Sequence, residues 1–422
     1  MMVVKVSASK ASGTINAPAS KSSMQRAVAA ALLAEGTSTL FNPSFSEDSL
    51  SAIKMAECLG ASVKISKEKV EIKGGFNPVC EILDCGESGL GVRMFSAIAA
   101  LSDKEIIFSG SGSILNRPMD MLKNPLESLG AIVVTMNGKL PLLLKGRLTG
   151  GKAKVDGSNS SQFLTGLLFA LPLAEEDSIL EISNLKSKPY IDLTLDVLNK
   201  FGISVENQDY KEFFIPGKQK YIATDYQVEG DWSGAAFLAV LGAISGKVTI
   251  HHLQLNSTQP DRMILDALKM AGANVEKDDK RIIVSPNKLK AFQFDITDCP
   301  DLAPPLVALA SFCEGKSVIT GTERLKAKES DRAFTLQKEF SALGIDIQEF
   351  ENKIEIIGRK NIEGGEVSSH GDHRIAMALA VAGTKATSPV TISGADAINK
   401  SYPDFFNDLQ KLGVVLETIK EE

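Results

Sequence analysis

The chain has 422 residues, which is too long for one ordinary hydrophobic core, so we expect two domains. Hydrophobic residues make up 44% of it and charged residues 23%, as is usual for soluble globular proteins. The formal net charge of −6 gives no support to a nucleic-acid partner, so any anion must be bound by local clusters of Lys and Arg.

Targeting and metal-binding signals are weak in this sequence. No apolar run approaches the roughly 18 residues that span a bilayer, and residues 1–15 lack the features of a signal peptide. We therefore expect a cytoplasmic protein without a membrane partner. His370 and His373 lie three residues apart, but no further ligand accompanies them, so no metal site is expected.

The cysteines show no CxxC pair, so we expect them to be reduced, mostly structural thiols. They are Cys58, Cys80, Cys85, Cys299 and Cys313.

The first predicted helix begins within PASKSSMQR, residues 18–26, directly before the apolar run AVAAALLA. A helix start exposes unpaired backbone N–H groups and carries positive partial charge. With Lys21, Ser22 and Arg26 added, this start would form a pocket for an anion. The alternative is a serine N-cap with two solvated cations.

Further along the chain, a helix that ends in Gly and leads into a strand-like run recurs six times, at intervals of 69 to 72 residues. Gly at this place is the usual left-handed residue that ends a helix. The recurring glycines are Gly60, Gly130, Gly202, Gly272, Gly344 and Gly413.

A second landmark keeps the same period. A small polar cluster begins an alanine-rich apolar helix near residues 22, 88, 160, 232, 301 and 372. The apolar residues lie nearly all round each of these helices, which indicates full burial. The other helix of each unit is amphipathic, and short β-branched runs such as KVEIKG and RIIVS predict strands.

Each unit of about 70 residues therefore predicts the order βαβαββ, and three units make a domain of about 210 residues. Buried helices with strands outside them define an inside-out α/β barrel. Six units therefore give two similar domains. A single dinucleotide-binding α/β fold is the alternative, but the even period and the missing GxGxxG motif disfavour it.

The polar clusters occupy one point of every repeat, the start of the buried helix. If the buried helices of each domain run parallel, their positive ends point one way. Two domains that face each other would then focus positive potential into the cleft between them. We therefore expect an anionic substrate at a domain interface.

The clusters that carry chemistry fall at the junctions of the repeats. They read ASKSSMQR from 19, GESGLGVR from 86, LNRPMD from 115, VDGSNSSQF from 155, LKAKESDR from 325, and SSHGDHR from 368 with NKSYPD from 399. Each alone has a structural explanation, such as a tight turn, a helix cap or an i,i+3 surface pair. Together, cations and hydroxyls concentrated at the junctions favour a ligand site.

The set SKSxxxR, SGxxxR, RP, DGSxSSQ, SKPYID, KESDR, DHR and KSYPDF resembles the EPSP synthase family, the enolpyruvyl transferases of the shikimate pathway of aromatic amino acid biosynthesis. The resemblance runs in order from Lys21 to Asp404. It implies the same two-domain, six-repeat fold, closed by giving the N-terminal strand to the second domain. The domains would then comprise residues 19–228 and residues 1–18 with 229–422. It also implies transfer of the enolpyruvyl group of phosphoenolpyruvate to the 5-hydroxyl of shikimate-3-phosphate, with release of phosphate.

The resemblance also implies two sets of binding residues. Shikimate-3-phosphate would be held by Lys21, Ser22, Arg26, Ser160, Ser161, Gln162, Ser187, Tyr190, Asp301 and Lys328. Phosphoenolpyruvate would be surrounded by Lys21, Gly89, Arg117, Gln162, Arg332, Arg374 and Lys400.

In the implied chemistry of addition and elimination, Glu329 protonates the methylene carbon and Asp301 removes the hydroxyl proton, assisted by Lys21. No metal, nucleotide or organic cofactor is implied. The expected partners are the two small substrates, and we expect a monomer.

The sequence departs from the family pattern in two places. The family commonly has Asn-Ala-Gly-Thr or Asn-Ser-Gly-Thr where this chain has Glu87-Ser88-Gly89-Leu90. An acid there would repel phosphoenolpyruvate unless it turns away or pairs with a cation such as Arg93. The role of Arg324, where the family often has Asn, and sensitivity to the family's inhibitor glyphosate stay open.

Two other functions compete with this interpretation. The sister enzyme that transfers enolpyruvyl to UDP-N-acetylglucosamine typically uses a loop cysteine, but GSGSILNRP carries Arg117 and no cysteine at the comparable place. A non-catalytic repeat protein that binds an acidic partner is the other alternative. It has no use for the paired acids Asp301 and Glu329 among the cations.

Overall fold

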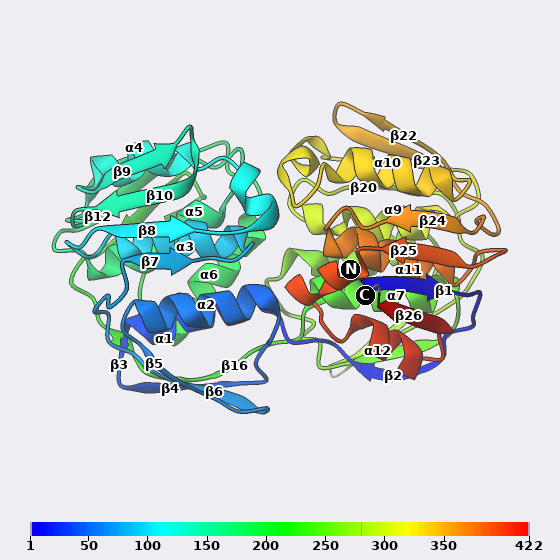
Figure 1. Cartoon of the computed structure of the whole chain (residues 1–422), viewed down its shortest axis with the longest axis horizontal. Helices are drawn as coiled ribbons and strands as arrows, with labels where there is room; N and C mark the ends of the chain where they lie inside the picture. The colour runs from blue at the N-terminus through cyan, green and yellow to red at the C-terminus, as the bar shows by residue number, and fades with distance from the viewer. Residues whose placement is uncertain (1, 280, 421–422) are drawn as a thin grey trace. The chain divides into compact units, whose positions relative to one another are not determined.

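The computed structural model describes residues 2–279 and 281–420. The chain divides into two compact units, which we call the N-terminal unit, Ala19–Val228, and the C-terminal unit, Met1–Pro18 with Glu229–Glu422 (Figure 1). Each unit has its own continuous core of buried apolar side chains. No helix among the described residues is both long and apolar enough to cross a membrane.

The N-terminal unit contains three four-stranded sheets. The first repeat comprises α1 (Lys21–Leu33), β4 (Thr37–Phe41), α2 (Glu47–Cys58), β5 (Ser62–Ile65), β6 (Lys69–Lys73) and β16 (Asp225–Gln227). The second comprises β7 (Ile82–Asp84), α3 (Gly89–Ala99), β8 (Ile106–Ser109), η1 (Gly112–Asn116), η2 (Asp120–Leu122), α4 (Lys123–Ser128), β9 (Ile132–Met136) and β10 (Lys139–Lys145). The third comprises β11 (Gly151–Asp156), α5 (Gln162–Ala170), η3 (Leu171–Leu173), β12 (Ser178–Ser183), α6 (Lys188–Lys200), β13 (Glu206–Gln208) and β14 (Glu212–Ile215).

The C-terminal unit repeats the pattern. Its first repeat comprises β2 (Gly13–Asn16), α7 (Trp232–Ile244), β17 (Val248–His251), η4 (Pro260–Met263), α8 (Ile264–Met270), β18 (Asn274–Asp278) and β19 (Arg281–Ser285). The second repeat comprises β20 (Gln293–Asp295), η5 (Pro300–Leu302), α9 (Ala303–Ala310), β21 (Lys316–Thr320), η6 (Glu323–Ala327), α10 (Arg332–Ala342), β22 (Asp346–Phe350) and β23 (Lys353–Ile357). The third repeat comprises β24 (Gly365–Ser368), α11 (His373–Gly383), β25 (Val390–Ser393), η7 (Ala395–Lys400), α12 (Phe405–Lys411), β26 (Leu416–Lys420) and β1 (Met2–Val6).

Every four-stranded sheet has the same topology. The first strand of the repeat lies parallel to the second, as β7 does to β8, and the last two strands form an antiparallel pair that joins the second, as β10 and β9 do. The βαβαββ repeat predicted from the glycine spacing is confirmed. A short parallel pair, β3 (Ala34–Glu35) with β15 (Tyr221–Ile222), adds one more contact between the ends of the N-terminal unit.

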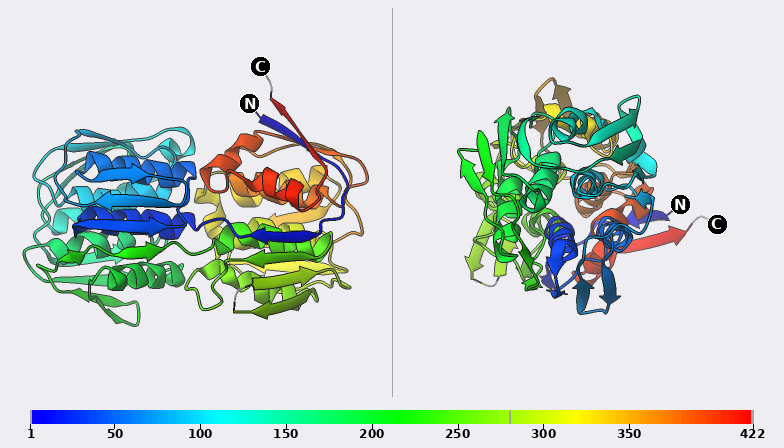
Figure 2. Two further views of the ribbon diagram at one scale, coloured as in Figure 1. Left: turned by 90° about the horizontal axis from the view of Figure 1, so that it is seen from below. Right: turned by 90° about the vertical axis from the view of Figure 1, so that its left-hand side faces the viewer.

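Both units close on themselves with strands that are distant in the sequence. β1 lies between β25 and β26, and β2 pairs in parallel with β17, so the N-terminal segment supplies two strands to two different sheets (Figure 2). The family resemblance implied a single N-terminal strand here. In the N-terminal unit, β16 pairs with β4 and takes the place of the strand that the first repeat lacks.

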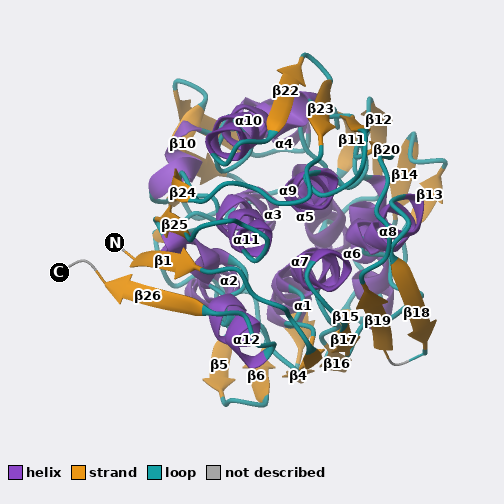
Figure 3. Ribbon diagram, turned by 90° about the vertical axis from the view of Figure 1, so that its right-hand side faces the viewer, coloured by secondary structure: helices purple, strands orange, loops and turns teal. Residues whose placement is uncertain are grey.

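The helices predicted to be buried lie inside the ring of sheets of their own unit (Figure 3). Every residue of α3 and of α11 is buried, and so are 12 of the 13 residues of α7. Small alanine and glycine side chains allow this close packing. A Cβ at Gly166 of α5, for example, would lie 2.7 Å from the carbonyl oxygen of Arg93 of α3.

The six recurring glycines all have positive φ angles, as the helix-ending motif requires. Gly60 shows why a side chain is excluded there. Its φ is +113°, and a Cβ would lie 2.6 Å from the carbonyl oxygen of Gly75.

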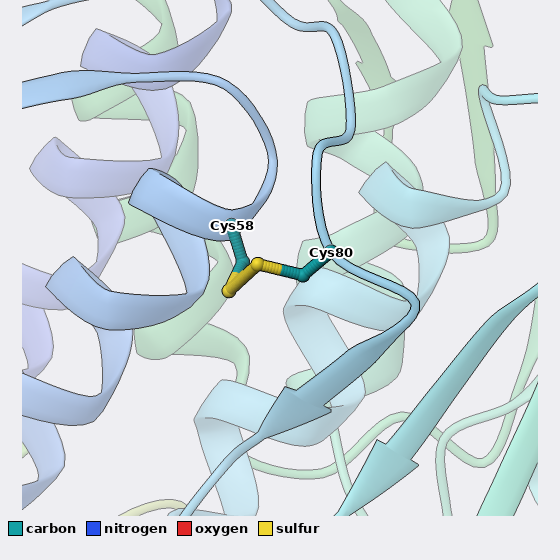
Figure 4. The surroundings of a disulfide bond; sticks show 2 residues. All are labelled: Cys58 and Cys80. Atoms are coloured by element: carbon teal, nitrogen blue, oxygen red, sulfur yellow. A yellow bond between two sulfur atoms is a disulfide. The ribbon is translucent and has the colours of Figure 1, made fainter.

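The prediction that all five cysteines are reduced is wrong for two of them. Cys58, the last residue of α2, is disulfide-bonded to Cys80 in the segment before β7 (Figure 4). The backbone N–H groups of Val79 and Cys80 donate to the carbonyl oxygen of Cys58, at 2.8 and 3.3 Å, and hold the two segments together. The remaining thiols, Cys85, Cys299 and Cys313, are buried.

We expect alkylation of the denatured protein without reductant to label three cysteines and, after reduction, five. Peptide mass mapping would place the unlabelled pair at Cys58 and Cys80. A Cys80→Ser variant serves as the control and should show four labels without reductant. Five labels on the unreduced wild type would contradict the disulfide.

Candidate active site

The predicted site residues at the start of α1 are held by neighbouring elements. Ser20 is the N-cap of α1 and accepts a hydrogen bond from the backbone N–H of Ser23 at 3.3 Å. The ammonium group of Lys21 forms an ion pair of 2.8 Å with Asp48, in the first turn of α2. Asp48 was not predicted from the sequence, because an acid in a first helical turn is common without any function.

Arg26 joins α1 to α6 from a buried position. Its guanidinium donates to the Thr194 hydroxyl at 3.0 Å and to the carbonyl oxygens of Ser22 at 2.9 Å and Tyr190 at 3.2 Å. Burial lowers the pKa of Arg26 to about 10, so it stays charged at neutral pH. Three predicted residues, Ser22, Arg26 and Tyr190, therefore lie together.

The glycine-rich turn before α3 brings two arginines against the helix start. Ser88 is the N-cap and accepts from the backbone N–H of Gly91 at 3.0 Å. A Cβ at Gly89 would lie 2.6 Å from Nη1 of Arg117 and 3.2 Å from Nη1 of Arg93. Glycine at this position lets the Arg117 guanidinium approach the backbone.

Gln162 lies at the start of α5 and links to the same group. Its side-chain oxygen accepts a hydrogen bond of 2.8 Å from Nη1 of Arg93, and its backbone N–H donates to the Ser160 hydroxyl at 3.2 Å. Ser161 is the buried N-cap residue. Arg93 stands in the SGxxxR motif but was not among the predicted ligands.

Ser187 is the N-cap of α6, is buried, and has left-handed backbone angles, with φ at 57°. Left-handed angles are uncommon for a residue other than glycine, asparagine or aspartate, and they cluster at functional sites.

In the C-terminal unit, Asp301 of η5 is the meeting point of three cations. Its carboxylate lies 3.3 Å from Nζ of Lys328, 2.8 Å from Nη1 of Arg332 and 2.9 Å from Nη2 of Arg374. Cations at such distances favour the ionised carboxylate. The structure thus brings together four of the residues that the family resemblance implied.

Arg332, the first residue of α10, contacts three carboxylates. Besides Asp301, it pairs with Glu329 at 2.5 Å and with Asp372 at 2.7 Å, and its side chain is 1% exposed. Burial works against its charge, but Asp372, Glu329 and Asp301 outweigh that and raise its pKa. Asp372, the N-cap of α11, was missed from the sequence, where it read only as a neighbour of Arg374.

Lys328 is a cation whose pKa is lowered by its surroundings. Burial lowers its pKa to about 8, although Asp301 acts to raise it. Between pH 8 and the pKa of 10.5 in the unfolded chain, the unfolded state binds more protons than the folded state. Lys328 therefore makes the protein more stable as pH rises through this window, and its ammonium form persists below it.

Lys400, His370 and His373 are further residues that the sequence singled out. Lys400 is buried at the end of η7, an element that packs against α11. His370 contacts Glu339 at 2.7 Å, and His373 is buried beside Asp372. Arg324, whose role the sequence left open, donates to the carbonyl oxygen of Thr297 at 3.4 Å.

Each unit therefore offers cations, hydroxyls and helix N-termini suited to oxyanions. The C-terminal unit adds two acids, Asp301 and Glu329, in contact with one arginine. Such a set can bind phosphate or carboxylate groups and move protons beside them.

Comparisons with known proteins agree over nearly the whole chain. The family model described as EPSP synthase (3-phosphoshikimate 1-carboxyvinyltransferase) matches residues 6–409. The 3-phosphoshikimate 1-carboxyvinyltransferase of Clostridium novyi (strain NT) is 39% identical, over 98% of each chain. That of Methanocaldococcus jannaschii is 40% identical, over 96% of each chain.

Solved structures also match over nearly the whole chain. An EPSP synthase structure from Acinetobacter baumannii has a TM-score of 0.84 at 27% identity and covers 99% of this chain and 100% of its own. The fold and the matches define a transferase of two repeated α/β units. The chain belongs to the EPSP synthase (3-phosphoshikimate 1-carboxyvinyltransferase) family.

We expect an Arg332→Leu variant to lose about 3 kcal/mol or more of its free energy of unfolding, because it leaves buried carboxylates without their cation. Asp372, which is fully buried, contributes most to this loss. Urea unfolding followed by circular dichroism measures it.

The matched control is Arg359→Leu, which removes an exposed ion pair with Glu363 of 3.6 Å and should cost less than about 1 kcal/mol. Equal losses in the two variants would show that the Arg332 cluster has no special energetic role.

Proposed function

We propose that this protein transfers the enolpyruvyl group of phosphoenolpyruvate to the 5-hydroxyl of shikimate-3-phosphate, which yields EPSP and phosphate. The observation that carries the proposal is the family match over residues 6–409. The cluster in which Asp301, Glu329 and Asp372 surround Arg332 supports it, because it combines anion binding with proton transfer.

In the N-terminal unit, we assign the residues nearest the starts of α1, α5 and α6 to shikimate-3-phosphate. Hydroxyls at a helix N-terminus suit a phosphate group, and the ring of Tyr190 offers a flat apolar face. The assigned residues are Lys21, Ser22, Arg26, Ser160, Ser161, Gln162, Ser187 and Tyr190, to which Asp301 and Lys328 of the C-terminal unit are added.

We assign phosphoenolpyruvate to the residues that the family resemblance names for a planar oxyanion. Arginine binds such groups in a bidentate way, and Gly89 lets the backbone approach closely. The assigned residues are Lys21, Gly89, Arg117, Gln162, Arg332, Arg374 and Lys400.

Asp301 is the proposed base, and its ionised form is favoured by its three cations. Glu329 is the proposed acid and must carry a proton before it can donate one. Its ion pair with Arg332 favours the ionised form. A substrate anion that engages Arg332 would weaken this pair and so favour protonation of Glu329 when the substrate is bound.

The function is tested by following phosphate release from phosphoenolpyruvate with shikimate-3-phosphate as the second substrate. UDP-N-acetylglucosamine replaces it in the control. We expect release with shikimate-3-phosphate alone. Release with the sugar nucleotide alone would assign the chain to the other enolpyruvyl transfer, and no release with either would reject both.

We expect Glu329→Gln to lower kcat by at least about 100-fold, the usual scale for the loss of an acid–base group. The amide oxygen of glutamine can still accept from Arg332, so the fold should be kept. The matched control is Glu363→Gln, at an exposed site in the same unit, which should leave kcat unchanged. Near-normal turnover in Glu329→Gln would remove Glu329 from the proton transfer.

A further inference from the structure

Glu87, the acid that departs from the family pattern, points to the loop that carries Arg117. It lies one residue before Ser88, the N-cap of α3. Its Oε2 atom accepts two hydrogen bonds from Ser113, one from the backbone N–H at 3.0 Å and one from the hydroxyl at 2.9 Å. Glu87 therefore binds the start of η1 with its negative charge.

Gly112 confirms how closely the carboxylate packs on this turn. It has a positive φ of 60°, and a Cβ at this position would overlap the carboxylate of Glu87. The first residue of η1 is thus shaped to accept the acid.

The contact closes a ring of residues that contains Arg117. η1 runs from Gly112 to Asn116, and Arg117 caps it by donating its backbone N–H to the carbonyl oxygen of Ile114 at 3.1 Å. The guanidinium of Arg117 lies back against Gly89, two residues after Glu87. The ring thus leads from Glu87 to Ser113, along η1 to Arg117, and back to the start of α3.

We propose that Glu87 is a positioning residue, which fixes η1 so that the Arg117 guanidinium lies over the start of α3. The proposal rests on the proposed function, in which Arg117 binds phosphoenolpyruvate. Glu87 does not touch the substrate in this scheme. It acts through Ser113 and the short 3₁₀ helix η1.

Repulsion of phosphoenolpyruvate by Glu87 would act against this positioning effect, since a negative charge near an anion site lowers affinity for that anion. The two effects have opposite signs on removal of the acid. If Glu87 mainly positions Arg117, its removal raises the KM for phosphoenolpyruvate. If it mainly repels the substrate, removal lowers that KM.

The kinetic experiment compares Glu87→Ala with Glu87→Gln in the phosphate-release assay. We expect Glu87→Ala to raise the KM for phosphoenolpyruvate by about 10-fold, with kcat and the KM for shikimate-3-phosphate changed less than about 3-fold. Glu87→Gln should stay near the wild type, because its amide oxygen can still accept from Ser113. An unchanged or lowered KM in Glu87→Ala would overturn the proposal.

Two controls separate positioning from general loss of structure. Asp177→Ala removes another carboxylate that accepts from a backbone N–H, that of Gly217 at 2.9 Å, and should leave both KM values unchanged. In an Arg117→Ala background, Glu87→Ala should add less than about 2-fold to the KM for phosphoenolpyruvate. A full additional 10-fold there would show that Glu87 acts independently of Arg117, against the proposal.

Hydrogen exchange at the Ser113 amide tests the positioning without any activity. We expect exchange at this amide to be slow in the wild type and in Glu87→Gln, and at least about 10-fold faster in Glu87→Ala. Equal rates in all three would overturn the proposal. If the wild type releases no phosphate, the proposed function fails, and the exchange rates still decide whether Glu87 holds η1.

Discussion

The structure depends on one constraint, which is that its alanine-rich helices are buried on every side. Because α3, α7 and α11 present apolar residues all round, the sheets must lie outside them, and the amphipathic helices must cover what remains. Several of the buried polar residues lie where these helices begin. The N-caps Ser88, Asp231 and Asp372 occupy those places, and candidate site residues lie beside Ser88 and Asp372.

Several cations of the candidate site are paired with acids of the chain itself. Lys21 pairs with Asp48, while Lys328, Arg332 and Arg374 share Asp301. In the proposed function, an anionic substrate would therefore meet cations that already have internal partners. This arrangement avoids the cost of buried, unpaired cations in the free protein, and it ties anion binding to a change in the surroundings of the proposed base.

The repeat and the buried helices could be predicted from the sequence because both depend on local patterns. Gly60 and its equivalents mark helix ends that need positive φ, and apolar residues all round a helix indicate burial. Arg332 and Asp301 were named as candidates from the family resemblance, and the structure places them in contact. Three contacts have no local signal because they join residues 22 to 186 positions apart. They are the Cys58–Cys80 bond, the pairing of β16 with β4, and the pairing of Glu87 with Ser113. Distant pairing of this kind is decided by packing, which a pattern of residue types does not encode.

The placement of β1 and β2 constrains the order in which the two units can fold during synthesis. These strands leave the ribosome first, yet β2 pairs with β17, which begins at Val248, and β1 lies between β25 and β26, which ends at Lys420. The N-terminal unit, by contrast, has all of its strands once Val228 has emerged. Since domains generally fold as units during synthesis, we expect the N-terminal unit to fold first, while β2 stays unpaired until β17 has emerged and β1 until β25 and β26 have emerged.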